Sequence, residues 1–213
     1  MLDRRSETVA DLDKASTLEG MHNWQNAAAA YAATRSLGLD NKTIKDAIMN
    51  FPGLAHRMED VGRISGKAGS IRFVNDSKGT NADATRQALK AYENIYWIAG
   101  GVAKEGGISK LTDVMGGVKK AYLIGEAASD FSITLSGENI NHQDCGTLDR
   151  AVMHAISDAS SSGIANPIIL LSPACASFDQ FKNFEIRGNA FRTQVQDIIM
   201  RYNESAKSKG QAA

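Results

Sequence analysis

The stretch Ile95-Tyr96-Trp97-Ile98-Ala99-Gly100-Gly101 is a continuous apolar run that ends in two glycines. An apolar run of this length, closed by glycine, is typical of a strand that is buried on both faces. Two further segments have the same character, Ala121-Tyr122-Leu123-Ile124-Gly125 and Ile168-Ile169-Leu170-Leu171-Ser172-Pro173. Because parallel sheets are usually covered on both faces, these runs together indicate a parallel sheet.

Amphipathic helical patterns separate these strands. Ile71–Val74 indicates another strand, and the polar turn after it leads into a helix with Ala84, Ala88, Leu89 and Tyr92 on one face. Further helices are expected from Thr147 and up to Tyr202. Strands that alternate with helices predict an α/β fold, namely an open, mostly parallel Rossmann-like sheet with helices on both faces.

The amino-terminal part has a different pattern. An alanine-rich stretch from Asn26 reads as a helix up to Leu37-Gly38, and Asn41 can cap a second helix that ends at Pro52-Gly53. Pro52-Gly53 is therefore the expected domain boundary. We expect residues 1–53 to form a short helical segment, residues 54–206 the α/β domain, and residues 207–213 a disordered tail.

Composition excludes several classes of function. Lys and Arg together number 24, as do Asp and Glu, so the chain has no basic surplus for nucleic acid or an anionic membrane. No apolar run approaches the roughly 20 residues that span a bilayer, and Met1–Arg5 does not lead into a signal sequence. Cys145 and Cys175 lack the spacing of a metal site or disulfide framework. A cytoplasmic protein is expected.

In open α/β sheets, ligands bind beyond the carboxyl ends of the strands. That rule selects four loops: 75–80, 100–107, 125–127 and 172–184. Loop 75–80 offers Asp76, Lys78 and hydroxyl groups just before a helix, an arrangement that suits anions. The alternative is an ordinary strand-to-helix turn with Thr80 as the N-cap.

Two more of these loops, 100–107 and 172–184, also carry polar groups. Loop 100–107 is glycine-rich and contains Lys104, but it lacks the pattern of a nucleotide phosphate loop. It could equally be a flexible turn. Loop 172–184 combines small residues, the Ser177 hydroxyl and aromatic side chains that can form the wall of a pocket, or else seal the core. Cys175 has no His or Asn partner pattern beside it, which favours an inert buried thiol.

Upstream, the amides of Asn23 and Asn26 stand three residues apart on one helical face. Polarity at a helix start would explain them as well. Arg57 lies just past the expected boundary and could clamp a phosphate, or form an ordinary surface ion pair.

Five segments carry a resemblance to a known family: Gly20–Asn26, Gly53–Glu59, Asn75–Asn81, Gly100–Lys104 and Ser172–Gly188. Together they resemble the Mur ligase family, and within it the branch that adds D-glutamate during peptidoglycan synthesis. The resemblance runs from about Leu18 to Tyr202. Its most specific part is Ser172–Gly188.

The resemblance implies an ATP-dependent ligase that forms an amide through an acyl phosphate, with ATP and Mg²⁺ as cofactors of the complete enzyme. Its substrates would be UDP-N-acetylmuramoyl-L-alanine and D-glutamate. It also implies nucleotide contacts by four residues: Asn23, Asn26, Arg57 and Asp76. The residues that resemble the D-glutamate site are Lys78, Thr80, Lys104, Ser177 and Phe184.

The sequence departs from the family in lacking a Gly-Lys-Ser/Thr phosphate loop. By resemblance, residues 1–53 are the end of the central ATP-binding domain and residues 54–206 are the carboxyl-terminal domain. No catalytic or metal-binding residue is assigned, and the chain alone is expected to be inactive and to need no cofactor. The alternative is a stand-alone Mur-ligase-like module that binds an acidic amino acid or a protein partner.

Overall fold

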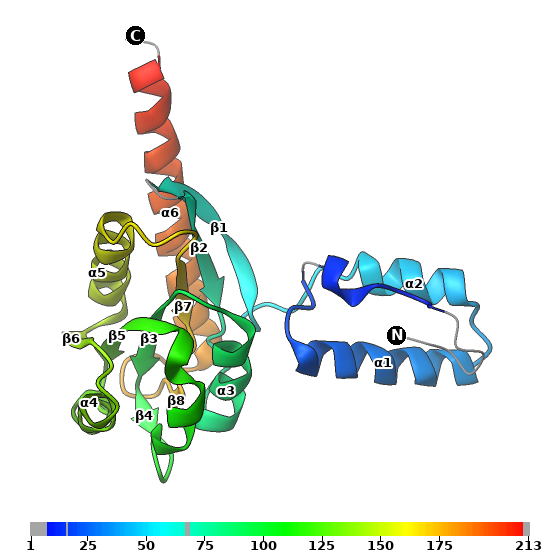
Figure 1. Ribbon diagram of the computed structural model, residues 1–213, viewed down its shortest axis with the longest axis horizontal. Helices are drawn as coiled ribbons and strands as arrows, with labels where there is room; N and C mark the ends of the chain where they lie inside the picture. Colours follow the sequence, from blue (N-terminus) through cyan, green and yellow to red (C-terminus); the bar gives the residue numbers. More distant parts are fainter. Residues whose placement is uncertain (1–7, 16, 67–68, 211–213) are drawn as a thin grey trace. The chain divides into compact units, whose positions relative to one another are not determined.

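The computed structural model describes residues 8–15, 17–66 and 69–210. The chain divides into two compact units, Met1–Leu54 and Ala55–Ala213 (Figure 1). Each unit has its own hydrophobic core, formed by residues between Val9 and Ile48 in the first unit and by residues from Ile64 onward in the second.

The first unit contains a short 3-10 helix, η1 (Leu12–Lys14), and two α-helices, α1 (Met21–Ser36) and α2 (Asn41–Met49). Helix α1 contains the alanine-rich stretch, and Asn23 and Asn26 lie in its first two turns, as expected for a helix that opens before Asn26. The predicted N-cap of α2 is wrong: the Asp40 carboxylate accepts the Thr43 N–H at 2.9 Å. The Asn41 amide oxygen instead accepts the Tyr31 hydroxyl at 2.9 Å, which joins the two helices.

The second unit is built on a six-stranded sheet of order β1-β2-β7-β3-β5-β6 (Figure 1). Its strands are β1 (Glu59–Gly66), β2 (Gly69–Asn75), β3 (Ile95–Gly100), β5 (Val118–Ile124), β6 (His142–Gly146) and β7 (Ile168–Leu171). Strands β1 and β2 pair in antiparallel fashion, and all the other pairs are parallel. The predicted open, mostly parallel α/β sheet is confirmed.

Side chains of β3 alternate between the two faces of the sheet. Ile95 and Trp97 join the core that also contains Phe131, whereas Tyr96 and Ile98 join the core that contains Phe191. The first face packs against α3 (Ala82–Ala91), the 3-10 helix η2 (Ser109–Gly117) and α4 (Ala128–Gly137). The second packs against α5 (Leu148–Ser161) and α6 (Phe184–Gly210). Burial on both faces is why the central strands are apolar throughout.

Among the elements not predicted from the sequence are the edge strands β1 and β6 and helix α4. Strands β1 and β6 lie at the two edges of the sheet, where polar side chains reach solvent, so neither forms an apolar run. Helix α4 has no side chain that caps its amino terminus, so it lacks the usual start signal.

Two expected helix ends are corrected by the structure. Helix α3 is capped by Asn81, whose Oδ1 accepts the Ala84 N–H at 2.9 Å, and not by Thr80. Helix α6 continues to Gly210 and projects past the sheet (Figure 1), whereas fraying was expected beyond Tyr202. The expected disordered tail at residues 207–213 stays a prediction, and residues 211–213 lie outside the described part.

None of the helices in the described ranges combines the length and apolar character needed to cross a membrane. Met1–Arg5, from which no signal sequence is expected, lie outside the described residues.

The core beneath α4 provides a test of packing. Phe131 is 1% exposed, and truncating it to alanine removes a ring from a close-packed site. We expect Phe131→Ala to lower the free energy of unfolding by about 3–5 kcal/mol. Urea denaturation followed by the fluorescence of the buried Trp97, in a Trp24→Phe background, measures this. Ile133→Ala on the same helix is the control, because Ile133 is 73% exposed; equal losses for both variants would contradict the assigned packing.

Candidate functional site

Three polar loops leave the same edge of the sheet. Asn75 pairs with Leu171 in neighbouring strands, and Ile98 pairs with Leu171 on its other side, so β2, β7 and β3 end together. Beyond that edge, the short strands β4 (Val102–Ala103) and β8 (Cys175–Ala176) pair in antiparallel fashion. Loops 75–80, 100–107 and 172–184 are thus brought together, as the rule for parallel sheets predicts.

The buried side chain of Arg187 ties two of these loops together. Its guanidinium donates from Nε to Ser77 Oγ at 3.0 Å, and from Nη2 to the carbonyls of Ser77 at 2.9 Å and Cys175 at 3.0 Å. Burial lowers the pKa of Arg187 to about 10, so the group is still charged at neutral pH. Arg187 lies within the most specific stretch, Ser172–Gly188, but nothing in its local pattern separates it from a surface arginine.

Asp76 is enclosed by hydrogen-bond donors. Its Oδ2 accepts from Ser172 Oγ at 2.7 Å, and its Oδ1 accepts the Met58 N–H at 3.3 Å. A Cβ on Gly79 would come within 2.7 Å of Oδ2, so only glycine fits there. Burial raises the pKa of Asp76 to about 7, although these hydrogen bonds and the charge of Arg57 act to lower it.

Arg57 lies between two residues with unusual backbone conformations. His56 and Met58 have φ angles of 63° and 47°, in the left-handed region that non-glycine residues seldom adopt. Such conformations persist only where the surroundings enforce them. Here the His56 carbonyl accepts the Lys78 N–H at 3.0 Å, while Met58 is bound to Asp76. The side chain of Arg57 itself is exposed.

A second cluster of polar side chains fixes the segment of residues 56–59, which contains Arg57. Glu59 accepts from Arg192 at 2.8 and 2.9 Å, and from the His56 N–H at 2.9 Å. Burial on its own would raise the pKa of Glu59, but these hydrogen bonds lower it. Nδ2 of Asn75 lies 3.1 Å from His56 Nδ1, from Glu59 Oε2 and from the Gly188 carbonyl. Neither His56 nor Arg192 was assigned a role from the sequence.

Lys78 and Phe184, both predicted for the D-glutamate site, are in direct contact. The Lys78 ammonium lies 3.8 Å from the centre of the Phe184 ring. The backbone carbonyl of Phe184 accepts the Ser77 hydroxyl at 2.8 Å, so the ring is anchored to the loop that carries Lys78. An ammonium beside a half-buried ring is a place for an acidic group with an aliphatic part.

The other residues predicted for this site lie on the same loops. Thr80 is half-buried at the end of loop 75–80, and Ser177, 3% exposed, follows β8. Lys104 follows β4, and its side chain is exposed. The pairing of β4 with β8 links the loops of Lys104 and Ser177.

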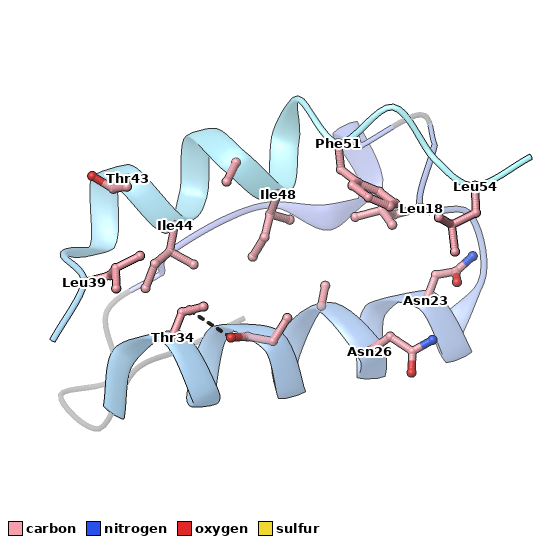
Figure 2. A pocket seen from close by; sticks show the side chains of 13 residues that line it. Leu18, Asn23, Asn26, Thr34, Leu39, Thr43, Ile44, Ile48, Phe51 and Leu54 are labelled. Carbon is pink, nitrogen blue, oxygen red and sulfur yellow. Dashed lines mark hydrogen bonds between the residues drawn. The ribbon is translucent and has the colours of Figure 1, made fainter. Parts of the chain in front are cut away.

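Asn23 and Asn26 belong to the first unit. Both line a groove of about 410 Å³ between α1 and α2, and they lie near one end of it (Figure 2). The groove is lined by alanine, leucine, isoleucine, phenylalanine, threonine and asparagine, with no charged residue. The Asn23 amide donates to the Glu19 carbonyl at 2.8 Å. An apolar groove with two amides lacks the cations that a dicarboxylate requires.

Within the described ranges, no group of three or more His, Cys, Asp or Glu side chains could hold a metal ion. Glu59 is engaged by Arg192, and Asp76 by Ser172 and Met58. The carboxylates of Glu59 and Asp76 are thus both engaged by donors of the protein itself.

Sequence comparison identifies related ligases. A UDP-N-acetylmuramoylalanine--D-glutamate ligase of Caulobacter vibrioides is 58% identical over 89% of the chain, and those of Agrobacterium fabrum and Bradyrhizobium diazoefficiens are 53% and 55% identical. The chain spans only 39–40% of the length of these relatives. No family model matches the chain.

Structure comparison identifies a similar fold. UDP-N-acetylmuramate-alanine ligase MurC of Thermotoga maritima superposes with a TM-score of 0.58 at 17% identity, covering 84% of this chain and 38% of that one. At this identity the likeness establishes the fold alone.

The raised pKa of Asp76 predicts a pH effect on stability. Between about pH 4 and pH 7 the folded chain keeps a proton that the unfolded chain releases, so the free energy of unfolding falls as the pH rises. Asp76→Asn removes this titration. Relative to the parent, the variant should gain about 4 kcal/mol in free energy of unfolding from pH 4 to pH 8, measured by urea denaturation.

Asp83→Asn is the matched control, because it removes an exposed carboxylate from the same unit. Its difference from the parent should stay nearly constant over this pH range. Parallel pH profiles for Asp76→Asn and the parent would show that Asp76 is ionised in the folded chain.

Proposed function

The chain belongs to the Mur ligase family, where it corresponds to a carboxyl-terminal part of the UDP-N-acetylmuramoylalanine–D-glutamate ligases, and we propose that it supplies the amino-acid site and part of the ATP site of such an enzyme. The complete reaction would join D-glutamate to UDP-N-acetylmuramoyl-L-alanine during peptidoglycan synthesis, in the cytoplasm. The γ-phosphoryl group of ATP would pass to the carboxylate of UDP-N-acetylmuramoyl-L-alanine with release of ADP, and the amine of D-glutamate would then attack the acyl phosphate with release of phosphate. Mg²⁺ would offset the negative charge of the phosphates.

The convergence of cations and hydroxyl groups at one edge of the sheet is the observation that supports this proposal. D-Glutamate carries two carboxylates on a short aliphatic stem. Lys78 and Lys104 can neutralise the carboxylates, and Thr80 and Ser177 can donate hydrogen bonds to them. The ring of Phe184, beside Lys78, can pack against the methylene groups.

The residues proposed to contact the nucleotide have complementary chemistry. The exposed guanidinium of Arg57 can clamp a phosphate through two parallel hydrogen bonds. The apolar groove beside Asn23 and Asn26 suits the flat, apolar faces and polar edge of a base. Asp76, which holds the Met58 N–H, would set the shape of the loop that presents Arg57.

Catalysis in such a reaction consists mainly of positioning and neutralisation of charge. In this proposal the chain holds the amino acid so that its amine faces the acyl phosphate, and its lysines offset the negative charges that come together there. The uridine nucleotide would bind to a part of the enzyme that this chain does not span; in the relatives, that part lies outside the matched 39–40% of the length.

The alternative, a stand-alone module for an acidic amino acid or a protein partner, is not favoured. The matched relatives are named as ligases, at 53–58% identity over 87–91% of the chain. The balanced charge of the chain gives no reason to propose a nucleic-acid partner.

Calorimetric titration with D-glutamate tests the amino-acid site. We expect D-glutamate to bind more tightly than L-glutamate, because a site built around two carboxylates fixes the direction of the amine. Lys104→Ala should weaken binding of D-glutamate about tenfold or more, the effect of losing a charge-assisted hydrogen bond. Lys110→Ala, which removes another exposed lysine from the same region, should leave it unchanged. Equal binding of the two enantiomers, or no effect of Lys104→Ala, would refute the assignment.

The chain on its own should not catalyse the ligation. No Gly-Lys-Ser/Thr loop occurs in its sequence, so the phosphates of ATP lack the cradle that the reaction requires. Incubation with ATP, Mg²⁺, D-glutamate and UDP-N-acetylmuramoyl-L-alanine should release no phosphate above the rate without protein. Phosphate release that depends on both substrates would contradict this expectation.

A further inference from the structure

The Lys78 ammonium lies over the face of the Phe184 ring. The ammonium stands 3.8 Å from the centre of the ring, which is close to the ideal arrangement for a cation above an aromatic face. A free lysine side chain has four rotatable bonds and samples many conformations. The ring thus reduces the number of positions that the Lys78 ammonium occupies.

His56 touches both members of this pair. Its backbone carbonyl accepts the Lys78 N–H at 3.0 Å, which fixes the backbone from which the lysine projects. Its imidazole packs against the Phe184 ring, with centroids 6.1 Å apart and planes at 79°. This nearly perpendicular arrangement is one that aromatic rings prefer. His56 therefore contacts both the backbone of Lys78 and the ring beneath the Lys78 ammonium.

His56 is itself held rigidly. It is 6% exposed and has a φ of 63°, and its N–H donates to Glu59 Oε2 at 2.9 Å. The amide nitrogen of Asn75 lies 3.1 Å from its Nδ1, within hydrogen-bond distance. Gly188 closes the other side, because a Cβ at that position would lie 2.2 Å from Nδ1. The imidazole therefore has little freedom to turn or shift.

We propose that His56 is a positioning residue, which acts through the Phe184 ring and the Lys78 backbone to hold the Lys78 ammonium ready for a carboxylate of the incoming amino acid. The inference rests on the proposed D-glutamate site and adds a residue that the resemblance does not place there. Ordering the lysine before the substrate arrives lowers the entropy lost on binding. The carboxylate then takes up an ammonium that is already in place.

Nuclear magnetic resonance of the full chain, with lysine labelled, reads this arrangement directly. Protons of the Lys78 ε-methylene group, held above the Phe184 ring, should be shifted upfield by the ring current. His56→Ala should move this signal toward that of a free lysine and weaken binding of D-glutamate about fivefold. His56→Phe keeps a ring against Phe184 and should restore most of both the shift and the affinity.

Two further variants serve as an independent test and as a control. Phe184→Leu removes the ring but none of the groups that hydrogen-bond His56, and it should abolish the upfield shift, so it tests the pair even if His56→Ala does not fold. Lys182→Ala removes an exposed lysine from the same loop and should change neither the Lys78 signal nor the affinity.

An unchanged Lys78 signal in a folded His56→Ala variant would overturn the inference. Loss of the upfield shift in His56→Ala, with no change in the affinity for D-glutamate, would also overturn the inference. If the parent chain shows the shifted signal and its dependence on His56 but does not bind D-glutamate, the proposed function is overturned, and the positioning of Lys78 by His56 is upheld.

Discussion

The buried guanidinium of Arg187 joins two loops that lie about a hundred residues apart in the sequence, and the shape of the candidate site depends on it. Two of its hydrogen bonds reach Ser77 in the first loop, and a third reaches the Cys175 carbonyl in the second. Burying a cation is costly unless its donors are satisfied, and Nη1 has no hydrogen-bond partner among the described residues. The three hydrogen bonds to Ser77 and Cys175 offset part of the cost of burying this charge, and they hold the two loops at a fixed distance from one another.

Close backbone contacts complete this arrangement. A Cβ on Gly101 would lie 2.3 Å from the Ala176 carbonyl, so the antiparallel contact of β4 with β8 requires glycine there. The same holds for Gly188 against His56. These two glycines, with the left-handed His56 and Met58, allow the loops to approach one another more closely than ordinary residues would permit.

Much of the fold could be predicted from the sequence, because a strand buried on both faces leaves a clear apolar run. Strands β3, β5 and β7 were predicted for this reason, whereas the edge strands β1 and β6, with polar outward positions, were not. In the site, the rule for strand ends selected the loops of Lys78, Lys104 and Ser177. The role of His56 could not be predicted, since it depends on Glu59, Asn75 and Gly188 meeting around one ring. Local pattern also cannot reveal that Asp76 is enclosed, because the hydroxyl that binds it belongs to Ser172, which follows β7 and lies 96 residues away.

The central claim is that the loops at the carboxyl edge of the sheet form a site for D-glutamate. A map of backbone amide chemical shifts on addition of D-glutamate tests it most directly. The account predicts changes confined to residues 75–80, 101–104 and 172–184, with the signals of α1 and α2 unmoved. Changes centred on the groove of Asn23 and Asn26, or spread evenly over the surface, would contradict it.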